Sequence, residues 1–208
     1  MTETRQLDAW RGEFGDAYTK RNVADDVAVN ARTRMWARIL DPLVGDEPQS
    51  ILEVGANLGL NMRALKQLTS ARRAAVEPNP AARERLVGDG ILPKEAVFDA
   101  TAGDLPFKDG EFDMAFTSGV LIHIAPSDLA QACKEIHRVS SKYIMCCEYF
   151  SDKVEEISYR GHAGLLFKRD FGEFWMTSHP DLTLLDYGFF WKRATGLDNL
   201  TWWLFRKR

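Results

Sequence analysis

A strand that runs directly into a glycine-containing turn and a helix constrains this 208-residue chain more than any other feature. Residues 51–54 are a largely apolar run, residues 55–59 read Gly-Ala-Asn-Leu-Gly, and apolar residues recur at helical spacing over 60–69. A strand, a tight turn and a helix in this order open a βαβ unit. Glycine at positions 55 and 59 permits positive φ and a close approach between backbone and ligand.

Strand-like and helical segments alternate along most of the chain. We expect helices over 60–69, 80–88 and 127–139, between strands over 50–54, 74–77, 95–98, 112–117 and 143–147. This alternation indicates a doubly wound parallel sheet with helices on both faces. The last two strand-like runs, 182–191 and 200–206, have no helical pattern between them, so we expect the last strand to be antiparallel.

The N-terminal residues 1–45 precede the first strand and have a helical pattern. Three aromatic residues recur at every fourth position and define one helix face: Trp10, Phe14 and Tyr18. This face either packs on the domain or forms a lid that closes a ligand pocket, with Arg21 near its end. A second helix is expected over 26–40, ending before Pro42.

Composition excludes several classes of protein. The net charge of −3 offers no field that attracts nucleic acid or an acidic membrane, and no apolar run approaches the roughly 20 residues of a membrane span. The three cysteines have no metal-ligand spacing, and Cys146 and Cys147 lie in an apolar run, so we expect reduced core thiols and no metal site. Without a signal-peptide pattern at residues 1–5, we expect a cytoplasmic protein.

The glycine turn does not match the motifs that bind phosphates. A dinucleotide site would read G-x-G-x-x-G, and a P-loop would end in G-K-[ST]; neither occurs here. S-adenosylmethionine instead offers an amino-acid end, a ribose diol and an adenine. Glu53 would accept from its ammonium group, and the loop amides with Asn57 would hold its carboxylate.

Acidic residues also end the next two expected strands. Glu77 follows residues 74–76 and would accept both ribose hydroxyls, while Asp99 would accept from the adenine amine. Since the carboxyl ends of parallel strands share one edge of a sheet, we expect these acids to lie in a row along one crevice. The sequence therefore predicts an S-adenosylmethionine site.

These motifs resemble those of class I S-adenosylmethionine-dependent methyltransferases over about residues 45–208. Residues 51–59 resemble the family's first motif, 76–79 its second, and 99–113 its segment between the third and fourth strands. Asn57 stands where the commoner pattern has glycine, and asparagine tolerates the left-handed region. The resemblance implies a seven-stranded Rossmann-like fold and these cofactor-binding residues: Glu53, Gly55, Ala56, Asn57, Gly59, Glu77, Pro78, Asp99, Ala100, Ser118 and Gly119.

A narrower resemblance covers nearly the whole chain. Segments 10–15, 119–124, 159–162, 166–170 and 201–205 are similar to the group called pseudaminic acid biosynthesis-associated methylases. This similarity implies a small-molecule acceptor, and a sugar-like one less strongly. We accordingly expect a single domain over 1–208, with a lid at 1–45, a core at 46–208 and a substrate-side insert at 148–178.

The reactive end of the pocket is expected after the fourth strand. His123 follows Ser118 and Gly119 there, and it either serves as a general base or packs beside the ribose. Tyr18 would help to exclude water. The insert either only covers the site or binds an anionic group of the acceptor, and the candidate substrate-binding residues are Arg21, Tyr149, Arg160, His162 and Lys168.

The sequence thus predicts methyl transfer to oxygen or nitrogen of a small polar acceptor, by a monomer or homodimer that binds neither nucleic acid nor membrane. Two alternatives stay open. The same cofactor supports intramolecular cyclisation or aminocarboxypropyl transfer on the same fold, and a non-catalytic binding module would carry the same cofactor residues.

Overall fold

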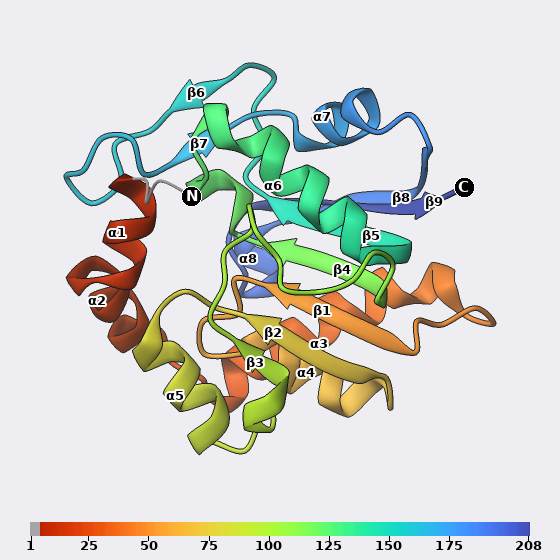
Figure 1. Cartoon of the computed structure of the whole chain (residues 1–208), viewed down its shortest axis with the longest axis horizontal. Coiled ribbons are helices and arrows are strands. Elements are labelled where there is room, and N and C mark those ends of the chain that lie inside the picture. Colours follow the sequence, from red (N-terminus) through yellow and green to blue (C-terminus); the bar gives the residue numbers. More distant parts are fainter. Residues whose placement is uncertain (1–4) are drawn as a thin grey trace.

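The computed structural model describes residues 5–208 and builds them around a seven-stranded sheet (Figure 1). In spatial order the strands are β3 (Val97–Phe98), β2 (Arg72–Val76), β1 (Ser50–Val54), β4 (Phe112–Ser118), β5 (Ser140–Glu148), β9 (Leu200–Lys207) and β8 (Leu182–Phe190). The first five run parallel, whereas β9 is antiparallel to both of its neighbours. The predicted doubly wound, mostly parallel sheet with an antiparallel last strand is therefore confirmed.

Helices cover both faces of this sheet (Figure 1). On one face lie α3 (Asp26–Leu40) and α4 (Leu60–Leu68), and on the other lie α6 (Pro126–Val139) and α7 (Phe171–Ser178). The helix α5 (Pro80–Gly88) contacts the β3 edge. Among the helices of residues 5–208, none combines the length and apolar character that crossing a bilayer requires.

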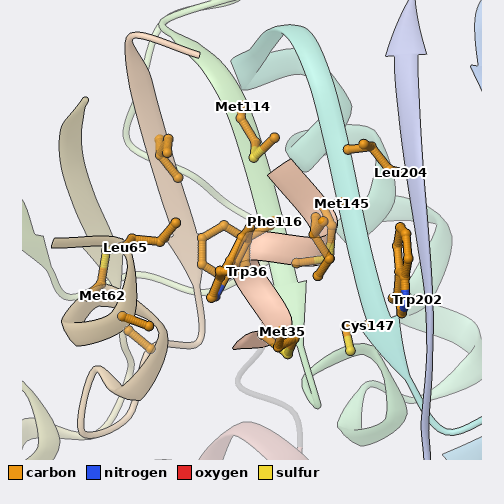
Figure 2. Close-up of a cluster of buried hydrophobic side chains, with 14 of the residues drawn as sticks. Met35, Trp36, Met62, Leu65, Met114, Phe116, Met145, Cys147, Trp202 and Leu204 are labelled. Carbon is orange, nitrogen blue, oxygen red and sulfur yellow. The ribbon is translucent and has the colours of Figure 1, made fainter. Parts of the chain in front are cut away.

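A buried apolar cluster fills each space between helices and sheet. On the α3 side, the indole of Trp36 meets the ring of Phe116 edge-on, with 4.6 Å between centroids (Figure 2). Consecutive residues of a strand face opposite sides, so Cys147 joins this cluster and Cys146 joins the other. All three cysteines are buried free thiols, and burial raises the pKa of Cys147 to about 12, as expected of core thiols.

The N-terminal segment differs from the single predicted helix. It forms α1 (Arg5–Arg11) and α2 (Glu13–Arg21), separated at Gly12, which adopts an extended backbone. Glycine has a low helix propensity, and the break lets Trp10 contact both Phe14 and Tyr18 at 5.2 Å between ring centroids. Residues 1–4 of the predicted lid lie outside the described part of the chain.

Other boundaries also shift. A short helix α8 (Lys192–Thr195) separates β8 from β9, where no helix was expected. It is a single turn that ends at Gly196, whose φ is 75°. The strand predicted over 95–98 shortens to β3, since the 3₁₀ helix η2 (Lys94–Ala96) takes its first residues. Helix α6 begins one residue before Ser127, because proline fits the first helical position. The insert contains the hairpin β6 (Glu155–Glu156) and β7 (Phe167–Lys168), followed by α7.

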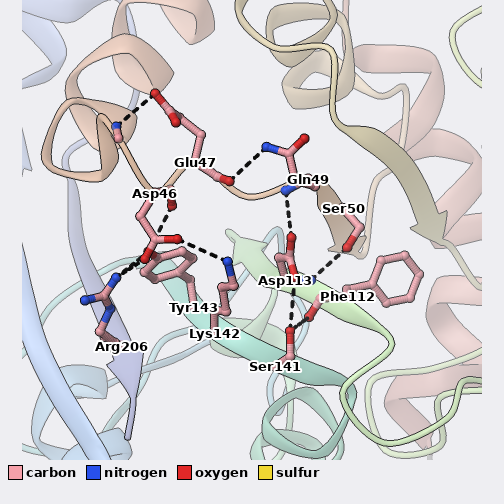
Figure 3. A network of polar contacts seen from close by, with 11 residues as sticks. Asp46, Glu47, Gln49, Ser50, Phe112, Asp113, Ser141, Lys142, Tyr143 and Arg206 are labelled. Carbon is pink, nitrogen blue, oxygen red and sulfur yellow. Dashed lines mark hydrogen bonds and ion pairs between the residues drawn. The ribbon is translucent and has the colours of Figure 1, made fainter.

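A polar network fastens the sheet at the end where β1, β4 and β5 begin (Figure 3). The Asp46 carboxylate accepts from the hydroxyl of Tyr143 at 2.8 Å and from Nζ of Lys142 at 3.1 Å, and it also pairs with Arg206 of β9. Asp113 of β4 accepts from the backbone N–H of Gln49 at 2.7 Å. These contacts hold the loop before β1 against the central strands, at the opposite end of the sheet from the carboxyl ends of β1, β2 and β4.

Candidate functional site

A cavity of about 770 Å³ opens at the carboxyl ends of β1, β2 and β4, where the strand order reverses. The loop between β1 and α4 forms its floor, and α1, α2 and α3 contribute side chains from above. Both proposed catalytic residues, His123 and Tyr18, line it. So do ten of the eleven expected cofactor residues: Glu53, Gly55, Ala56, Asn57, Glu77, Pro78, Asp99, Ala100, Ser118 and Gly119.

The floor requires glycine at two positions. Gly55 has φ 80°, and a Cβ atom there would lie 2.6 Å from the Val120 side chain. Gly59 has φ 69°, and a Cβ atom would lie 2.4 Å from Cδ2 of Leu86 in α5. Gly59 therefore lies behind the cavity and shapes the turn. Asn57 adopts the left-handed region, with φ 45°, as its side chain permits.

The loop amides are occupied within the protein, contrary to the expectation that they would hold a carboxylate. The N–H groups of Gly55 and Ala56 donate to the carbonyl of Val76, at 2.8 and 3.2 Å. The N–H of Asn57 donates to Glu77, and its side-chain oxygen accepts from the hydroxyl of Thr19 at 3.1 Å. These bonds tie the turn to β2 and α2 because a tight loop must satisfy its own backbone groups.

Glu53 projects from the end of β1 into the cavity and is almost fully buried. Its Oε1 accepts from Nδ2 of Asn61 at 2.7 Å, and Asn61 in turn accepts from the indole N–H of Trp36. Its Oε2 is buried without a hydrogen-bond partner in the described part of the chain. Burial raises the pKa of Glu53 to about 8.

Arg32 of α3 lines the same cavity, and its Nε is also buried without a hydrogen-bond partner among residues 5–208. An unsatisfied buried donor and an unsatisfied buried acceptor each destabilise the free protein, so both are poised for a ligand. Oε2 of Glu53 matches an ammonium group, and Arg32 matches a carboxylate. The pair therefore fits the amino-acid end of S-adenosylmethionine.

The other two acids differ in environment. Both oxygens of Glu77 accept backbone N–H groups, from Asn57 at 2.7 Å and from Asn79 at 2.8 Å. Burial raises the pKa of Glu77 in spite of these bonds. The Asp99 carboxylate is half exposed and pairs with Arg83 at 2.9 Å and Arg11 at 3.2 Å. Each carboxylate oxygen keeps a second lone pair, so both acids can still accept from a ligand.

His123 belongs to the 3₁₀ helix η3 (Leu121–His123) at the far side of the cavity. Its Nδ1 lies 2.6 Å from the carbonyl oxygen of Leu165. A carbonyl can only accept, so Nδ1 carries the proton and Nε2 presents a lone pair. Burial lowers the pKa of His123 to about 4, which keeps the imidazole neutral at physiological pH.

Glu148 holds this short helix in place from the end of β5. Its carboxylate is fully buried and accepts from the backbone N–H groups of Val120 at 3.2 Å and Leu121 at 3.1 Å, with a longer contact to Ile122. Burial raises the pKa of Glu148 to about 7. The contact fixes the backbone that precedes His123.

Two segments far apart in the chain roof the cavity. The ring of Trp10 lies 4.7 Å from that of His123, and Phe14 lies 6.0 Å from Tyr159 and 5.5 Å from His162 of the insert. Nε2 of Gln6 donates to the carbonyl of Gly164 at 3.1 Å. The aromatic face of the N-terminal helices thus contacts the insert above the site.

None of the candidate substrate-binding residues lines this cavity. Cζ of Arg21 lies 5.8 Å from the Tyr18 ring, and Cζ of Arg160 lies 5.7 Å from the Tyr159 ring. His162 stands across the hairpin turn, where Arg160 and Gly161 both have positive φ. Tyr149 and Lys168 line a second, more open cleft.

Three residues of the site were not predicted. Asn61 and Glu148 carried a usable signal, since each is a polar residue within an apolar pattern, and Glu148 ends a strand as Glu53 and Glu77 do. Arg32 carried a weaker signal: it shares a helix face with Trp36 and Ile39, four and seven residues later, although a helical arginine ordinarily faces solvent.

Comparison with known proteins is consistent with this geometry. Residues 52–143 match the family model described as a methyltransferase domain. No curated protein sequence matches the chain. The fold is similar to that of 1,6-didemethyltoxoflavin-N1-methyltransferase from Burkholderia thailandensis, solved with 1,6-didemethyltoxoflavin and S-adenosylhomocysteine; the TM-score is 0.76 at 19% identity, over 100% of this chain and 91% of that one.

Two further structures show how widely this fold is used. An S-adenosylmethionine-dependent methyltransferase from Leishmania major matches with a TM-score of 0.73 at 16% identity, over 97% of this chain and 86% of that one. The [4+2]-cyclase SpnF matches with a TM-score of 0.62 at 14% identity, over 84% and 81%. At these identities the likeness shows the fold alone. Residues 52–143 therefore match a methyltransferase domain, on the fold that these S-adenosylmethionine-dependent methyltransferases share.

Proposed function

We propose that the chain, as a single domain, transfers a methyl group to oxygen or nitrogen of a small polar metabolite. The observation that carries this proposal is the roof over His123, where Trp10 lies 4.7 Å from the imidazole and the N-terminal helices contact the insert. A cavity of about 770 Å³ suits a cofactor with a small partner. The roof favours a small acceptor over a polymer strand, and the net charge of −3 gives nucleic acid no general attraction.

When bound, S-adenosylmethionine supplies an electrophilic methyl group on a sulfonium. The residues that would hold it are Glu53 and Arg32 at the amino-acid end, Glu77 at the ribose and Asp99 at the adenine. Pro78 and Ala100 adjoin these acids, and Ser118 with Gly119 adjoins the reactive end of the cavity. The roof residues Trp10 and Tyr18 would exclude water, which strengthens every electrostatic contact inside.

His123 would orient the acceptor rather than ionise it before attack. With Nδ1 committed to Leu165, only Nε2 can accept a hydrogen bond from an acceptor O–H or N–H. A pKa of about 4 makes the imidazole a weak base at neutral pH, so proton removal would follow bond formation, when the acceptor becomes acidic. This order favours an acceptor whose nucleophilic atom needs no prior deprotonation, such as an amine or ring nitrogen.

The narrower resemblance supports a sugar-like metabolite through residues of the roof and insert, and the nitrogen-methylating Burkholderia thailandensis enzyme supports a heterocyclic one. We place the enzyme in the cytoplasm, as a monomer or homodimer. Aminocarboxypropyl transfer or intramolecular cyclisation of the cofactor is the alternative to be tested, and the likeness to a [4+2]-cyclase supports only that this fold serves more than one reaction.

Incubation with methyl-labelled S-adenosylmethionine and a panel of amines, heterocycles and sugars separates the alternatives. Methyl transfer moves the label to the acceptor with an equal amount of S-adenosylhomocysteine. Aminocarboxypropyl transfer or cyclisation leaves the label in methylthioadenosine. Binding of S-adenosylhomocysteine without turnover by any panel member would point to a binding module. Arg32→Met should weaken S-adenosylhomocysteine binding, whereas Arg34→Met, on the same helix but outside the cavity, should leave it unchanged.

A further inference from the structure

A second cleft, of about 730 Å³, lies beside the roofed cavity and takes no part in the site described above. Its walls come from the residues after β5, the end of β8, β7 of the insert, and the segment from α8 into β9. We name it the aromatic cleft, and its aromatic lining is Tyr149, Phe150, Tyr187, Phe189 and Trp203.

Three of these aromatic rings are exposed to an unusual degree. Phe150 is 48% exposed, Tyr187 63% and Phe189 59%. Tyr187 and Phe189 project from the same face of the edge strand β8, and Phe150 lies 6.5 Å from the Trp203 ring at the cleft base. Exposed aromatic side chains gathered in a concave surface mark a place where a ligand removes apolar area from water.

The polar groups of the cleft leave one cation without an acidic partner. Asp198 is neutralised by Lys192 at 2.9 Å and accepts from the Tyr149 hydroxyl at 3.0 Å, while Asp170 caps the start of α7 by accepting from the N–H of Glu173. Nζ of Lys168 lies 5.5 Å from the Tyr149 ring, and no acidic side chain of residues 5–208 pairs with it. The cleft thus offers stacking surfaces with a single available ammonium group.

The cleft adjoins the reactive end of the cavity. Strand β7, which carries Lys168 of the cleft, contacts the 3₁₀ helix η3, which carries His123 of the cavity. A molecule lying in the aromatic cleft is therefore placed next to the roofed site rather than on a remote surface.

We propose that the aromatic cleft is a second subsite of the acceptor and holds a ring that carries an anionic group. Phe150, Tyr187 and Phe189 stack on the ring, and Lys168 pairs with the carboxylate, sulfonate or phosphate. The proposal deepens the function stated above and rests on it, since it defines the acceptor as an anionic cyclic molecule long enough to reach from the cleft to the cavity.

The test uses protein saturated with S-adenosylhomocysteine, so that the cofactor part of the cavity is filled, and the fluorescent aromatic anion 8-anilinonaphthalene-1-sulfonate. Its neutral analogue N-phenyl-1-naphthylamine serves as the matched probe. We expect one bound anion per chain. Lys168→Met should raise the Kd for the sulfonate about tenfold and leave the Kd for the neutral analogue unchanged. The paired change Tyr187→Ser with Phe189→Ser should weaken both probes.

Lys153→Met is the control, because Lys153 is an exposed insert lysine outside the cleft. Equal sulfonate affinity in the wild type and Lys168→Met would overturn the proposal. So would a wild-type dimer that sedimentation shows to dissociate on the paired serine change, since the cleft would then be a subunit interface. Binding of S-adenosylhomocysteine is measured separately, so failure of the subsite is distinguished from failure of the methyltransferase function.

Discussion

Asn61 donates from Nδ2 to Oε1 of Glu53 at 2.7 Å and leaves Oε2 of the same carboxylate buried and unpartnered. One oxygen of the acid is thereby held by the fold, and the other is available to a ligand. The indole N–H of Trp36 holds Asn61 in turn, so a core tryptophan and a cofactor residue are linked through one amide side chain. The contact joins the α3–α4 core to the binding site.

The raised pKa of Glu53 has a consequence for stability against pH. In the folded protein the group holds its proton up to about pH 8, whereas its ordinary pKa is 4.5, so unfolding releases a proton between these values. The free energy of unfolding should therefore fall as pH rises through this window, by at most about 1.4 kcal/mol per pH unit. Glu53→Gln removes this contribution. Urea titrations from pH 5 to 9 should give a flatter profile for the variant, and parallel profiles would contradict the assignment.

Cofactor binding should release a proton at the same residue. An ammonium group beside Oε2 favours the carboxylate form of Glu53, which is mostly protonated in the free protein at pH 7. Calorimetric titration of S-adenosylhomocysteine in buffers of different ionisation enthalpy should show close to one proton released per site. Glu53→Gln should bind more weakly and release less. An identical release in both proteins would place the proton elsewhere.

Gly59→Ala should destabilise the protein by more than the cost of placing an alanine in the left-handed region. The added methyl group would lie 2.4 Å from Leu86, whereas Gly90 has a similar φ of 67° and open space around it. Gly90→Ala should therefore cost about 1 kcal/mol and Gly59→Ala about 2–4 kcal/mol. Thermal or urea unfolding measures both. Adding Leu86→Ala to Gly59→Ala should remove the steric part of the effect, and equal losses for the two single variants would refute it.

Glu148→Gln should slow catalysis without weakening cofactor binding. The amide keeps the size of the side chain, but one oxygen becomes an NH₂ group that cannot accept from the backbone N–H groups of η3, so η3 and His123 are held less firmly. We expect kcat to fall about tenfold while the Kd of S-adenosylhomocysteine stays within twofold. Glu84→Gln, at an exposed position of α5 outside the cavity, is the matched control. A change in Kd with kcat preserved would mean that Glu148 supports the cofactor loop instead.

Asp46→Asn should lower the stability of the fold and leave the rate of methyl transfer unchanged. Its partners Lys142, Tyr143 and Arg206 lower the pKa of Asp46, so its contribution is present above pH 3.8 and is lost as pH falls below it. The variant should unfold at lower urea concentration at neutral pH, with a smaller difference in high salt. Methyl transfer should be unchanged, because the network lies at the opposite end of the sheet (Figure 3). Loss of kcat in folded protein would contradict this separation.

Local patterns in the chain were sufficient to predict the sheet and most of the cavity. Apolar runs ending in acids are short-range signals, and the parallel arrangement places Glu53, Glu77 and Asp99 at one edge once the strands are recognised. The break at Gly12 and the helical turn of α8 were not predicted. Each involves only a few residues, whose weak local helix propensity is overridden by tertiary packing.

The substrate residues were harder because no local pattern shows which way an irregular insert folds. Arg160 and His162 lie on a turn in which Arg160 and Gly161 have positive φ, while Lys168 lines a separate cleft. Arg32 lies on the same face of α3 as Trp36 and Ile39, which pack on the sheet, and it reaches the cavity because that face extends past the carboxyl end of β1. The spacing of apolar residues along one sequence does not reveal long-range contacts of this kind.

The hydrogen bond from Thr19 to Asn57 couples the roof to the floor of the site. If α2 moved away to admit or release a molecule, the turn that carries Asn57 would lose this hydrogen bond. Entry of the acceptor and retention of the cofactor would then depend on the same movement of α2. Such an enzyme is expected to bind its two substrates in a compulsory order, with the cofactor first, and to be limited at saturation by the reopening that frees its products.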